Sequence, residues 1–358
     1  MSQRIIEIDG ATMEGGGQIL RMAVAFSALL KKPIKVNNIR AGRSKPGLRP
    51  QHLAGLKLVR DFTNGQLLGA EVGSTEITFY PGDIQDGKYS ADTGTAGSIM
   101  LLFQVSFPCL LFAGGTSKLH FTGGTNADMA PQIDHTLMVF KPIAELLGAR
   151  FDCRIIKRGY FPKGGGVVEI TVYPVEDYLK SVELLNPGEI TDITGISFVA
   201  GVLPLKLAHE MADSATCNLQ QKFSKVPIKI ERLKEPAHLA EGNGTGIVLV
   251  AKTSTGCLIG SGALGKRGVT SSVVGASAAK DLLDDCDRKA CVDSYLQDQL
   301  VIFMALAKGI SKVNIGKVTL HTKTAVFIAE LMTEARFTFS ADETQQCIME
   351  CKGIGLQR

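Results

Sequence analysis

The chain has 358 residues, of which 45% are hydrophobic and 21% are charged, and its formal net charge is +4. These values are typical of a soluble globular protein with two or three domains. The net charge is too small to indicate a polyanionic partner, so binding to nucleic acid would need a local cluster of basic residues.

The sequence argues against a secreted or membrane protein. The N-terminal segment contains no apolar signal core, and the longest apolar stretch, 99–113, is interrupted by Gln104 and Pro108. Such a stretch is too short to span a bilayer. The eight cysteines form no CxxC pair and no metal-type spacing. We therefore expect buried free thiols in an intracellular protein that does not associate with membranes.

In chain order, the hydrophobic pattern predicts one arrangement three times: a helix, an apolar strand, a polar loop, a second helix and two strands. The three copies cover residues 17–81, 97–174 and 295–351. The first helix of each copy is strongly apolar and the second is amphipathic, and the six are expected at 19–30, 53–62, 98–112, 133–147, 296–307 and 323–332. The strands after the first helices are expected at 34–40, 118–124 and 312–318. Three such units can bury one another's apolar helices.

The segment between the second and third copies alternates strands and helices with short turns, which predicts a compact α/β unit. Its expected strands and helices are 194–203, 207–223, 228–233, 246–254 and 272–284. We interpret it as a small inserted domain, 185–288, within a large domain made of 1–184 and 289–358.

His321 is the sharpest candidate for a catalytic residue. It follows the strand-like segment 312–320 and precedes a helix expected to begin near Thr322 or Lys323. The positive end of a helix dipole disfavours a protonated ring, and a neutral imidazole is a competent nucleophile. The exposed amides of such a helix end also suit a phosphate. From local sequence alone, an ordinary exposed or hydrogen-bonded histidine near a helix cap is the alternative.

A basic loop, RAGRSKPGLRPQH, precedes the second helix of the first copy. It contains four cationic residues and a histidine, namely Arg40, Arg43, Lys45, Arg49 and His52. No Asp or Glu occurs from 15 to 60. Because arginine binds phosphate bidentately, the loop indicates a site for phosphate or an RNA backbone. The alternative is an ordinary solvated charged loop.

The glycine-rich segment MEGGGQILR (13–21) opens the first helix of the first copy. Its glycines allow a ligand to approach the backbone and leave the helix amides available. Glu14 could hold a divalent metal together with phosphate oxygens, and Arg21 could bind the same anion. A glycine turn with an exposed glutamate explains the local sequence equally well.

Two further glycine-rich segments are candidates for binding nucleic acid or a nucleotide, and we keep only the first. KRGYFPKGGG (157–166) is expected to form a hairpin loop, in which Arg158 and Lys163 could contact a nucleic-acid backbone; a flexible hairpin tip is the alternative. GSGALGKRG (260–268) approaches the phosphate-loop pattern, but Arg267 stands where the metal-binding Ser or Thr is required. We therefore reject the second segment as a nucleotide site.

Six segments resemble signature segments of the RNA 3′-terminal phosphate cyclase family. In chain order they are MEGGGQILR, IRAGRSKPGLRPQH, GGTNADMAPQID, RGYFPKGGG, YLQDQL and VTLHT. The resemblance extends over essentially the whole chain and is to the catalytic, class I type. It implies an α/β (α+β) fold of three βαβαββ-type repeats packed with their helices inward, plus a small inserted α/β domain.

The resemblance also implies an ATP-dependent, metal-assisted enzyme that converts an RNA 3′-phosphate end into a 2′,3′-cyclic phosphate. His321 would attack the α-phosphate of ATP, giving a histidine–AMP phosphoramidate and pyrophosphate. AMP would then pass to the RNA 3′-phosphate, and the neighbouring 2′-OH would expel it. The implied partners are ATP, Mg²⁺ or Mn²⁺ and RNA with a 3′-phosphate end, with no obligate protein partner. A eukaryotic member would reside in the nucleus.

The resemblance carries over residue roles as well. Glu14 would hold the metal. Phosphates of ATP or of the RNA end would be bound by Arg21, Arg40, Arg43, Gln51 and His52. Pro131, Tyr295 and Gln299 would form the adenine pocket, and Gln104 is a weaker assignment to the ATP site.

Three other functions compete with this interpretation. A noncatalytic relative acts in ribosomal RNA processing but lacks the nucleophilic histidine, whereas this chain keeps His321. A transferase of phosphorylated small metabolites, resembling enolpyruvyl transferases, would share the repeat but would not explain the insert or RGYFPKGGG. A plain RNA-binding module predicts no covalent nucleotide.

Overall fold

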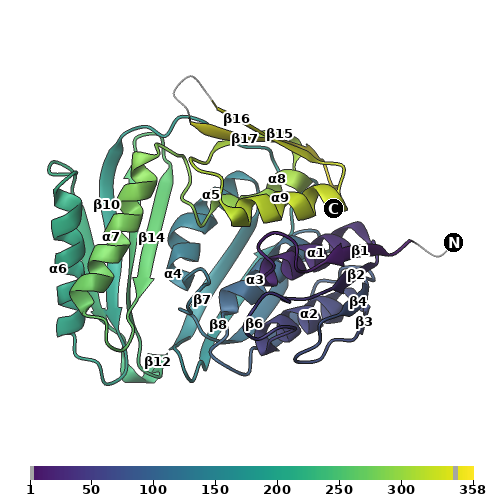
Figure 1. The fold of residues 1–358 in the computed structure, drawn as a ribbon, viewed down its shortest axis with the longest axis horizontal. Helices are drawn as coiled ribbons and strands as arrows, with labels where there is room; N and C mark the ends of the chain where they lie inside the picture. Colours follow the sequence, from purple (N-terminus) through teal and green to yellow (C-terminus); the bar gives the residue numbers. More distant parts are fainter. Residues whose placement is uncertain (1–3, 342–345) are drawn as a thin grey trace.

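The computed structural model describes residues 4–341 and 346–358, which form a mixed α/β fold with four sheets (Figure 1). The elements of the first sheet and its helices are β1 (Ile6–Asp9), α1 (Gly17–Leu30), β2 (Ile34–Asn37), α2 (Pro50–Thr63), β3 (Gln66–Leu68) and β4 (Ile77–Tyr80). The strand order is β1-β2-β4-β3, and β1 runs parallel to β2. Helix α1 packs inward because apolar residues such as Ile19, Ala23 and Phe26 recur with helical spacing and are buried.

The second sheet is formed in the same way. Its elements are β5 (Lys88–Asp92), α3 (Ile99–Leu110), β6 (Ser117–Gly123), α4 (Ile133–His135), a π-helical turn (Thr136–Phe140), α5 (Lys141–Leu146), β7 (Arg150–Gly159) and β8 (Gly166–Tyr173). The strand order is β5-β6-β8-β7, and the short strand β12 (Ala240–Glu241) extends the sheet beside β7.

The third sheet uses the C-terminal part of the chain together with one distant strand. Its elements are β9 (Glu183–Leu184), α8 (Gln297–Leu306), β15 (Lys308–Asn314), α9 (Leu320–Met332), β16 (Arg336–Ala341) and β17 (Cys347–Ile354). The strand order is β9-β15-β17-β16, with β9 parallel to β15. All three sheets therefore share one strand order, counted along the chain: first, second, fourth, third.

The residues between β9 and α8 form the fourth sheet and its helices. The elements are β10 (Ile190–Val199), α6 (Lys206–Gln220), β11 (Ile228–Lys234), a 3₁₀ turn (Ala237–Leu239), β12, β13 (Thr245–Thr253), β14 (Leu258–Leu264) and α7 (Ser271–Asp287). The sheet has the order β11-β10-β13-β14 and is covered by α6 and α7 at the left of Figure 1. The domain limits 1–184, 185–288 and 289–358 stay a prediction.

The main core lies where the helices of the first three sheets meet. Aromatic rings from α3, the π-helical turn, β7 and α8 pack against one another there, at centroid distances of 4.6 to 6.3 Å, and belong to Phe103, Phe107, Phe140, Phe151 and Phe303. Helices α1, α2 and α9 contribute to the same core. A separate core of aliphatic residues fills the space between the fourth sheet and α6 and α7.

Several element predictions need correction. The hydrophobic pattern did not predict the leading strands β1, β5 and β9, because they are short and partly exposed and β9 has only two residues; only the resemblance to a βαβαββ repeat implied a leading strand. The third early strand was predicted at 312–318, whereas β15 spans Lys308–Asn314. The chain turns at Gly316, which has a positive φ of 67°, so the residues after Asn314 connect the strand to α9.

The rejected segment GSGALGKRG contributes most of β14 rather than a phosphate loop. Its glycines allow close packing: a Cβ on Gly260 would lie 2.7 Å from Cδ2 of His135, and one on Gly262 would lie 2.6 Å from Nε2 of Gln132. Larger side chains would push the fourth sheet away from the start of α4.

All eight cysteines are free; Cys109, Cys257, Cys291 and Cys351 are buried, but Cys217 is exposed, contrary to expectation. In the described part of the chain, no helix is both long and apolar enough to cross a membrane.

Arg158 does not serve as a surface contact for nucleic acid, because the hairpin base buries its guanidinium. Asp134 accepts two hydrogen bonds from it, at 2.7 and 2.8 Å, and Glu235 binds its Nε at 2.6 Å. Its side chain is only 11% exposed. Arg158 therefore connects the second sheet to the insert, and of the two predicted hairpin cations only Lys163 lies at the surface.

We expect Asp134→Ala to lower the free energy of unfolding by about 3–5 kcal/mol, because it leaves the Arg158 guanidinium buried without its bidentate partner. Urea denaturation followed by circular dichroism measures the change. Glu169→Ala is the matched control, since it breaks an exposed arginine pair with Arg154 and should cost less than about 1 kcal/mol. Equal losses in the two variants would contradict a structural role for the buried cluster.

Candidate active site

His321 lies in the first turn of α9, so the helix begins earlier than predicted. Thr319 caps it, with its hydroxyl accepting a hydrogen bond from the backbone N–H of Thr322 at 3.1 Å. Burial lowers the pKa of His321, and the charges of Arg21 and Arg43 lower it further. The imidazole is therefore neutral at physiological pH, as a nucleophile requires.

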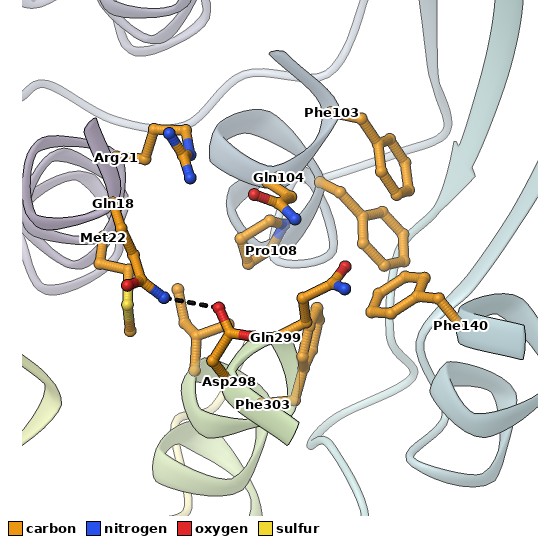
Figure 2. A pocket seen from close by; sticks show the side chains of 12 residues that line it. Gln18, Arg21, Met22, Phe103, Gln104, Pro108, Phe140, Asp298, Gln299 and Phe303 are labelled. Atoms are coloured by element: carbon orange, nitrogen blue, oxygen red, sulfur yellow. Dashed lines mark hydrogen bonds between the residues drawn. The ribbon is translucent and has the colours of Figure 1, made fainter. Parts of the chain in front are cut away.

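Two residues that the sequence analysis did not single out connect His321 to the neighbouring helices. Nδ1 of His321 lies 3.1 Å from Oε1 of Gln18 on α1. Nε2 of Gln18 donates to Oδ2 of Asp298 on α8 at 2.6 Å (Figure 2). Gln18 and Asp298 belong to the quoted segments MEGGGQILR and YLQDQL, but nothing in those segments indicates that the two side chains meet.

Gln18 and Asp298 line a cavity between α1, α3 and α8 (Figure 2). Arg21, Gln104 and Gln299 also line it, and the remaining wall is apolar. The structure thus brings together Gln104 and Gln299, two of the predicted ATP-binding residues, with the predicted phosphate ligand Arg21. This arrangement supplies amide groups and one cation on a largely apolar background, as ligand pockets commonly do.

Glu14 connects the glycine-rich turn to α9 and to the basic loop. Its backbone N–H donates to Oγ1 of Thr324 at 3.3 Å, and its carboxylate pairs with Arg43. Arg43 also donates to the backbone carbonyl of Glu14 at 3.2 Å. A Cβ on Gly16 would lie 2.1 Å from Oε2 of Glu14, so glycine is required for the carboxylate to occupy this position.

His52 lies in a basic loop but is neutral rather than cationic. Its Nδ1 accepts a hydrogen bond from the backbone N–H of Arg49 at 3.1 Å, so its proton lies on Nε2. Burial, followed by the charges of Arg21, Arg40 and Arg49, lowers the pKa of His52 to about 3. A Cβ on Gly17 would lie 2.6 Å from Nε2. His52 therefore presents a neutral N–H donor at the start of α1.

Arg40 and Gln51 are partly occupied by contacts within the protein. Arg40 donates to the backbone carbonyls of Lys45 and Gly47, at 2.8 and 2.9 Å, and braces its own loop. Oε1 of Gln51 accepts from the backbone N–H of Ser98 at 3.1 Å, at the beginning of α3. Both residues lie near the other candidates, but their side chains already stabilise the walls of the site.

Pro131 and Tyr295 line a second cavity, of about 150 Å³, with residues of the insert on the opposite wall. Asp293 fixes Tyr295, because its Oδ1 accepts from the backbone N–H of Tyr295 at 2.9 Å and its Oδ2 lies 3.1 Å from Nε2 of His135. Gln299, one turn after Tyr295, donates to its carbonyl at 2.6 Å but lines the first cavity. The predicted adenine-binding residues thus lie on two neighbouring cavities.

A family model described as RNA 3′-terminal phosphate cyclase matches residues 12–339 of the chain. The chain belongs to the RNA 3′-terminal phosphate cyclase family. The match includes the insert and every candidate site residue, and it agrees with the resemblance of the six segments.

Relatives from distant organisms confirm membership of the RNA 3′-terminal phosphate cyclase family over the full length. A protein of that name from Drosophila melanogaster is 39% identical over 99% of this chain and 98% of its own. A probable cyclase from Dictyostelium discoideum is 42% identical, covering 97% and 82%. One from Pyrobaculum aerophilum is 38% identical, covering 99% of both.

Among solved structures, the enolpyruvyl transferase NikO from Streptomyces tendae aligns with 98% of this chain and 82% of its own. Its identity is 10% and its TM-score 0.25. A score this low does not support a shared fold.

The resemblance to the cyclase family implies a metal ion, and Glu14 is its candidate ligand. Across residues 4–341 and 346–358, no group of three or more His, Cys, Asp and Glu side chains is placed to hold a metal ion. Glu14 offers a single carboxylate, whose Oε1 pairs with Arg43 and whose Oε2 lies next to Gly16. One carboxylate fits Mg²⁺ in nucleotide sites, where phosphates and water supply the other ligands.

Proposed function

We propose that the chain uses ATP to convert an RNA 3′-phosphate end into a 2′,3′-cyclic phosphate, with His321 as the nucleophile. The observation that carries the proposal is the placement of a neutral imidazole at the start of α9, beside Arg21 and Arg43 and next to the Glu14 turn. Such a group can attack phosphorus while the guanidinium groups stabilise the phosphate charge.

Three displacements account for the reaction. In the first, the ring nitrogen of His321 bonds to the α-phosphorus of ATP and the bond to the β-phosphate oxygen breaks, releasing pyrophosphate. In the second, an oxygen of the RNA 3′-phosphate attacks the same phosphorus and the P–N bond breaks, which restores the histidine. In the third, the 2′-oxygen attacks the RNA phosphorus, the bond from that phosphorus to the bridging oxygen of AMP breaks, AMP leaves and the 2′-hydroxyl proton passes to water. Adenylylation supplies the leaving group that a phosphate monoester lacks, and the 2′-OH is already adjacent.

The contacts within the site favour distinct roles for the phosphate-binding candidates. Arg21 and Arg43 are the proposed direct phosphate ligands, because their charges act on His321, although Arg43 also pairs with Glu14. His52 donates a neutral N–H, while Arg40 and Gln51 chiefly hold the basic loop and the start of α3. Glu14 would hold Mg²⁺ or Mn²⁺, which when bound neutralises charge on the triphosphate.

The cavity beside Pro131 and Tyr295 is the proposed adenine site. The tyrosine ring and the proline provide apolar faces for a base, and Gln299 or Gln104 approaches from the first cavity. A nuclear location, which the family resemblance implies for eukaryotic members, stays a prediction.

An RNA oligonucleotide with a 3′-phosphate tests the proposal. We expect the purified protein, with ATP and Mg²⁺ or Mn²⁺, to make the end resistant to phosphatase, and the same RNA without ATP to remain sensitive. A 2′-deoxy terminal nucleotide, which lacks the attacking hydroxyl, should stop at the adenylylated end. RNA binding without any change of the end would instead support a noncatalytic RNA-processing factor.

A further inference from the structure

His321, Gln18 and Asp298 form a continuous chain of hydrogen-bonding groups. Figure 2 shows the bond between Gln18 and Asp298. The two distances are 3.1 Å between Nδ1 of His321 and Oε1 of Gln18, and 2.6 Å between Nε2 of Gln18 and Oδ2 of Asp298. The three groups come from α9, α1 and α8. Gln18 is only 6% exposed, so its amide cannot exchange these partners freely for water.

When Asp298 is ionised, its chemistry determines every proton in this chain. An ionised carboxylate only accepts hydrogen bonds, so the Gln18 group that faces Asp298 must be its NH₂. The Gln18 carbonyl then faces His321 and also only accepts. Nδ1 of His321 must therefore carry the proton, which leaves the lone pair on Nε2.

We infer that Gln18 and Asp298 are positioning residues that hold His321 in the tautomer whose Nε2 lone pair attacks phosphorus. This inference rests on the proposed function, because it assumes that His321 is the nucleophile. It goes beyond that function by assigning roles to two residues that touch neither ATP nor RNA in the proposed reaction.

The protonation state of Asp298 should control the direction of the hydrogen bonds in the same chain. Burial raises the pKa of Asp298 to about 7, although the charge of Arg21 opposes this shift and the charge of Asp293 adds to it. Of the other residues around the cavity, Gln104 and Gln299 are uncharged. A protonated Asp298 would become a donor, and the Gln18 amide could reverse to meet it. His321 would then face an NH₂ group, which favours the tautomer with the proton on Nε2.

Two substitutions of Gln18 distinguish loss of the hydrogen-bonded chain from reversal of its hydrogen bonds. Gln18→Met keeps the size of the side chain but removes the acceptor, so both tautomers should form and the rate of enzyme adenylylation should fall about tenfold. Gln18→Lys presents a donor to Nδ1 and can pair with Asp298, so it should enforce the wrong tautomer and reduce the rate by about 10²-fold or more. The Michaelis constant for ATP should change less than about threefold in either variant.

Nitrogen-15 NMR of histidine-labelled protein reports the tautomer directly and does not depend on activity. At a pH above the pKa of Asp298, we expect Nδ1 of His321 to be protonated in the wild type, a mixture in Gln18→Met and protonated Nε2 in Gln18→Lys. Asp298→Asn should remove any change of tautomer ratio near pH 7. Gln297→Met is the matched control, because it removes another buried glutamine amide, from the residue adjacent to Asp298, and should leave the His321 signals unchanged.

The outcomes distinguish the two proposals. Protonated Nε2 in the wild type at a pH where Asp298 is ionised, or an unchanged tautomer and rate in Gln18→Met and Gln18→Lys, would overturn the role of the hydrogen-bonded chain even if the protein forms an adenylate. Conversely, the expected tautomer pattern in a protein that never forms an adenylate would overturn the proposed function. The hydrogen-bonded chain would then have only a structural role. Equal loss of rate in Gln297→Met would show that the effects are only structural.

Discussion

His321→Ala is expected to abolish transfer of label from α-labelled ATP to the protein. Nucleophilic attack requires the imidazole lone pair, and neither the Gln18 amide nor the guanidinium groups of Arg21 and Arg43 are nucleophiles. The other neutral imidazole, His52, is not free to replace it, because its Nδ1 lone pair accepts from the backbone N–H of Arg49. Denaturing electrophoresis after incubation with the divalent metal measures the label. In the wild type, a phosphoramidate should be labile in acid and stable in base.

His120→Ala is the matched control for this experiment. His120 lies exposed on β6, where it faces Glu169 at 4.0 Å. The variant should retain the full label. An unchanged label in His321→Ala, or a label that is stable in acid, would exclude the phosphoramidate and with it the first step of the proposed reaction.

Arg43→Gln is expected to slow adenylylation about 10- to 100-fold and to move the acid side of its pH profile to higher pH. The loss of rate follows from removing a charge-assisted phosphate contact. The shift follows from electrostatics: Arg43 is one cause of the lowered pKa of His321, so its removal raises that pKa. The ring then becomes protonated, and stops reacting, at a higher pH than in the wild type.

Single-turnover adenylylation rates across pH measure both effects. Arg60→Gln is the control, because Arg60 is exposed, pairs with Asp61 and should change neither the rate nor the profile. With RNA as substrate, Arg43→Gln should also weaken the dependence of binding on salt, since one phosphate contact is lost. A reduced rate with an unmoved acid limb would show that Arg43 does not act on the ionisation of His321.

The helices of the fold were predictable because apolar residues recur along them with helical spacing. The prediction 19–30 corresponds to α1 (Gly17–Leu30), and 296–307 corresponds to α8 (Gln297–Leu306). The start of α9 was less predictable, because a hydroxyl cap at Thr319 competes with the other threonines at 322 and 324. Short strands carry too few residues for a period of two to show, which is why β9 was missed.

The side-chain partners of the site were not predictable from local sequence. Arg158 resembles a surface cation in the hairpin segment, yet Asp134 and Glu235 bury it. Gln18 resembles any residue of an apolar helix, and its function depends on Asp298, which lies 280 residues later. Local patterns show which residue types a segment presents, whereas the partner of a buried polar group depends on how distant helices pack.

The bond between His321 and Gln18 joins positions separated by 303 residues. A ribosome must therefore release nearly all of the polypeptide before this pair can form, and contacts of such long range are also slow to close during folding. Nascent or C-terminally shortened chains that stop before α9 would lack His321 and also the residues that α9 contributes to the main core. Premature termination should therefore remove the proposed nucleophile and the packing that positions it at the same time.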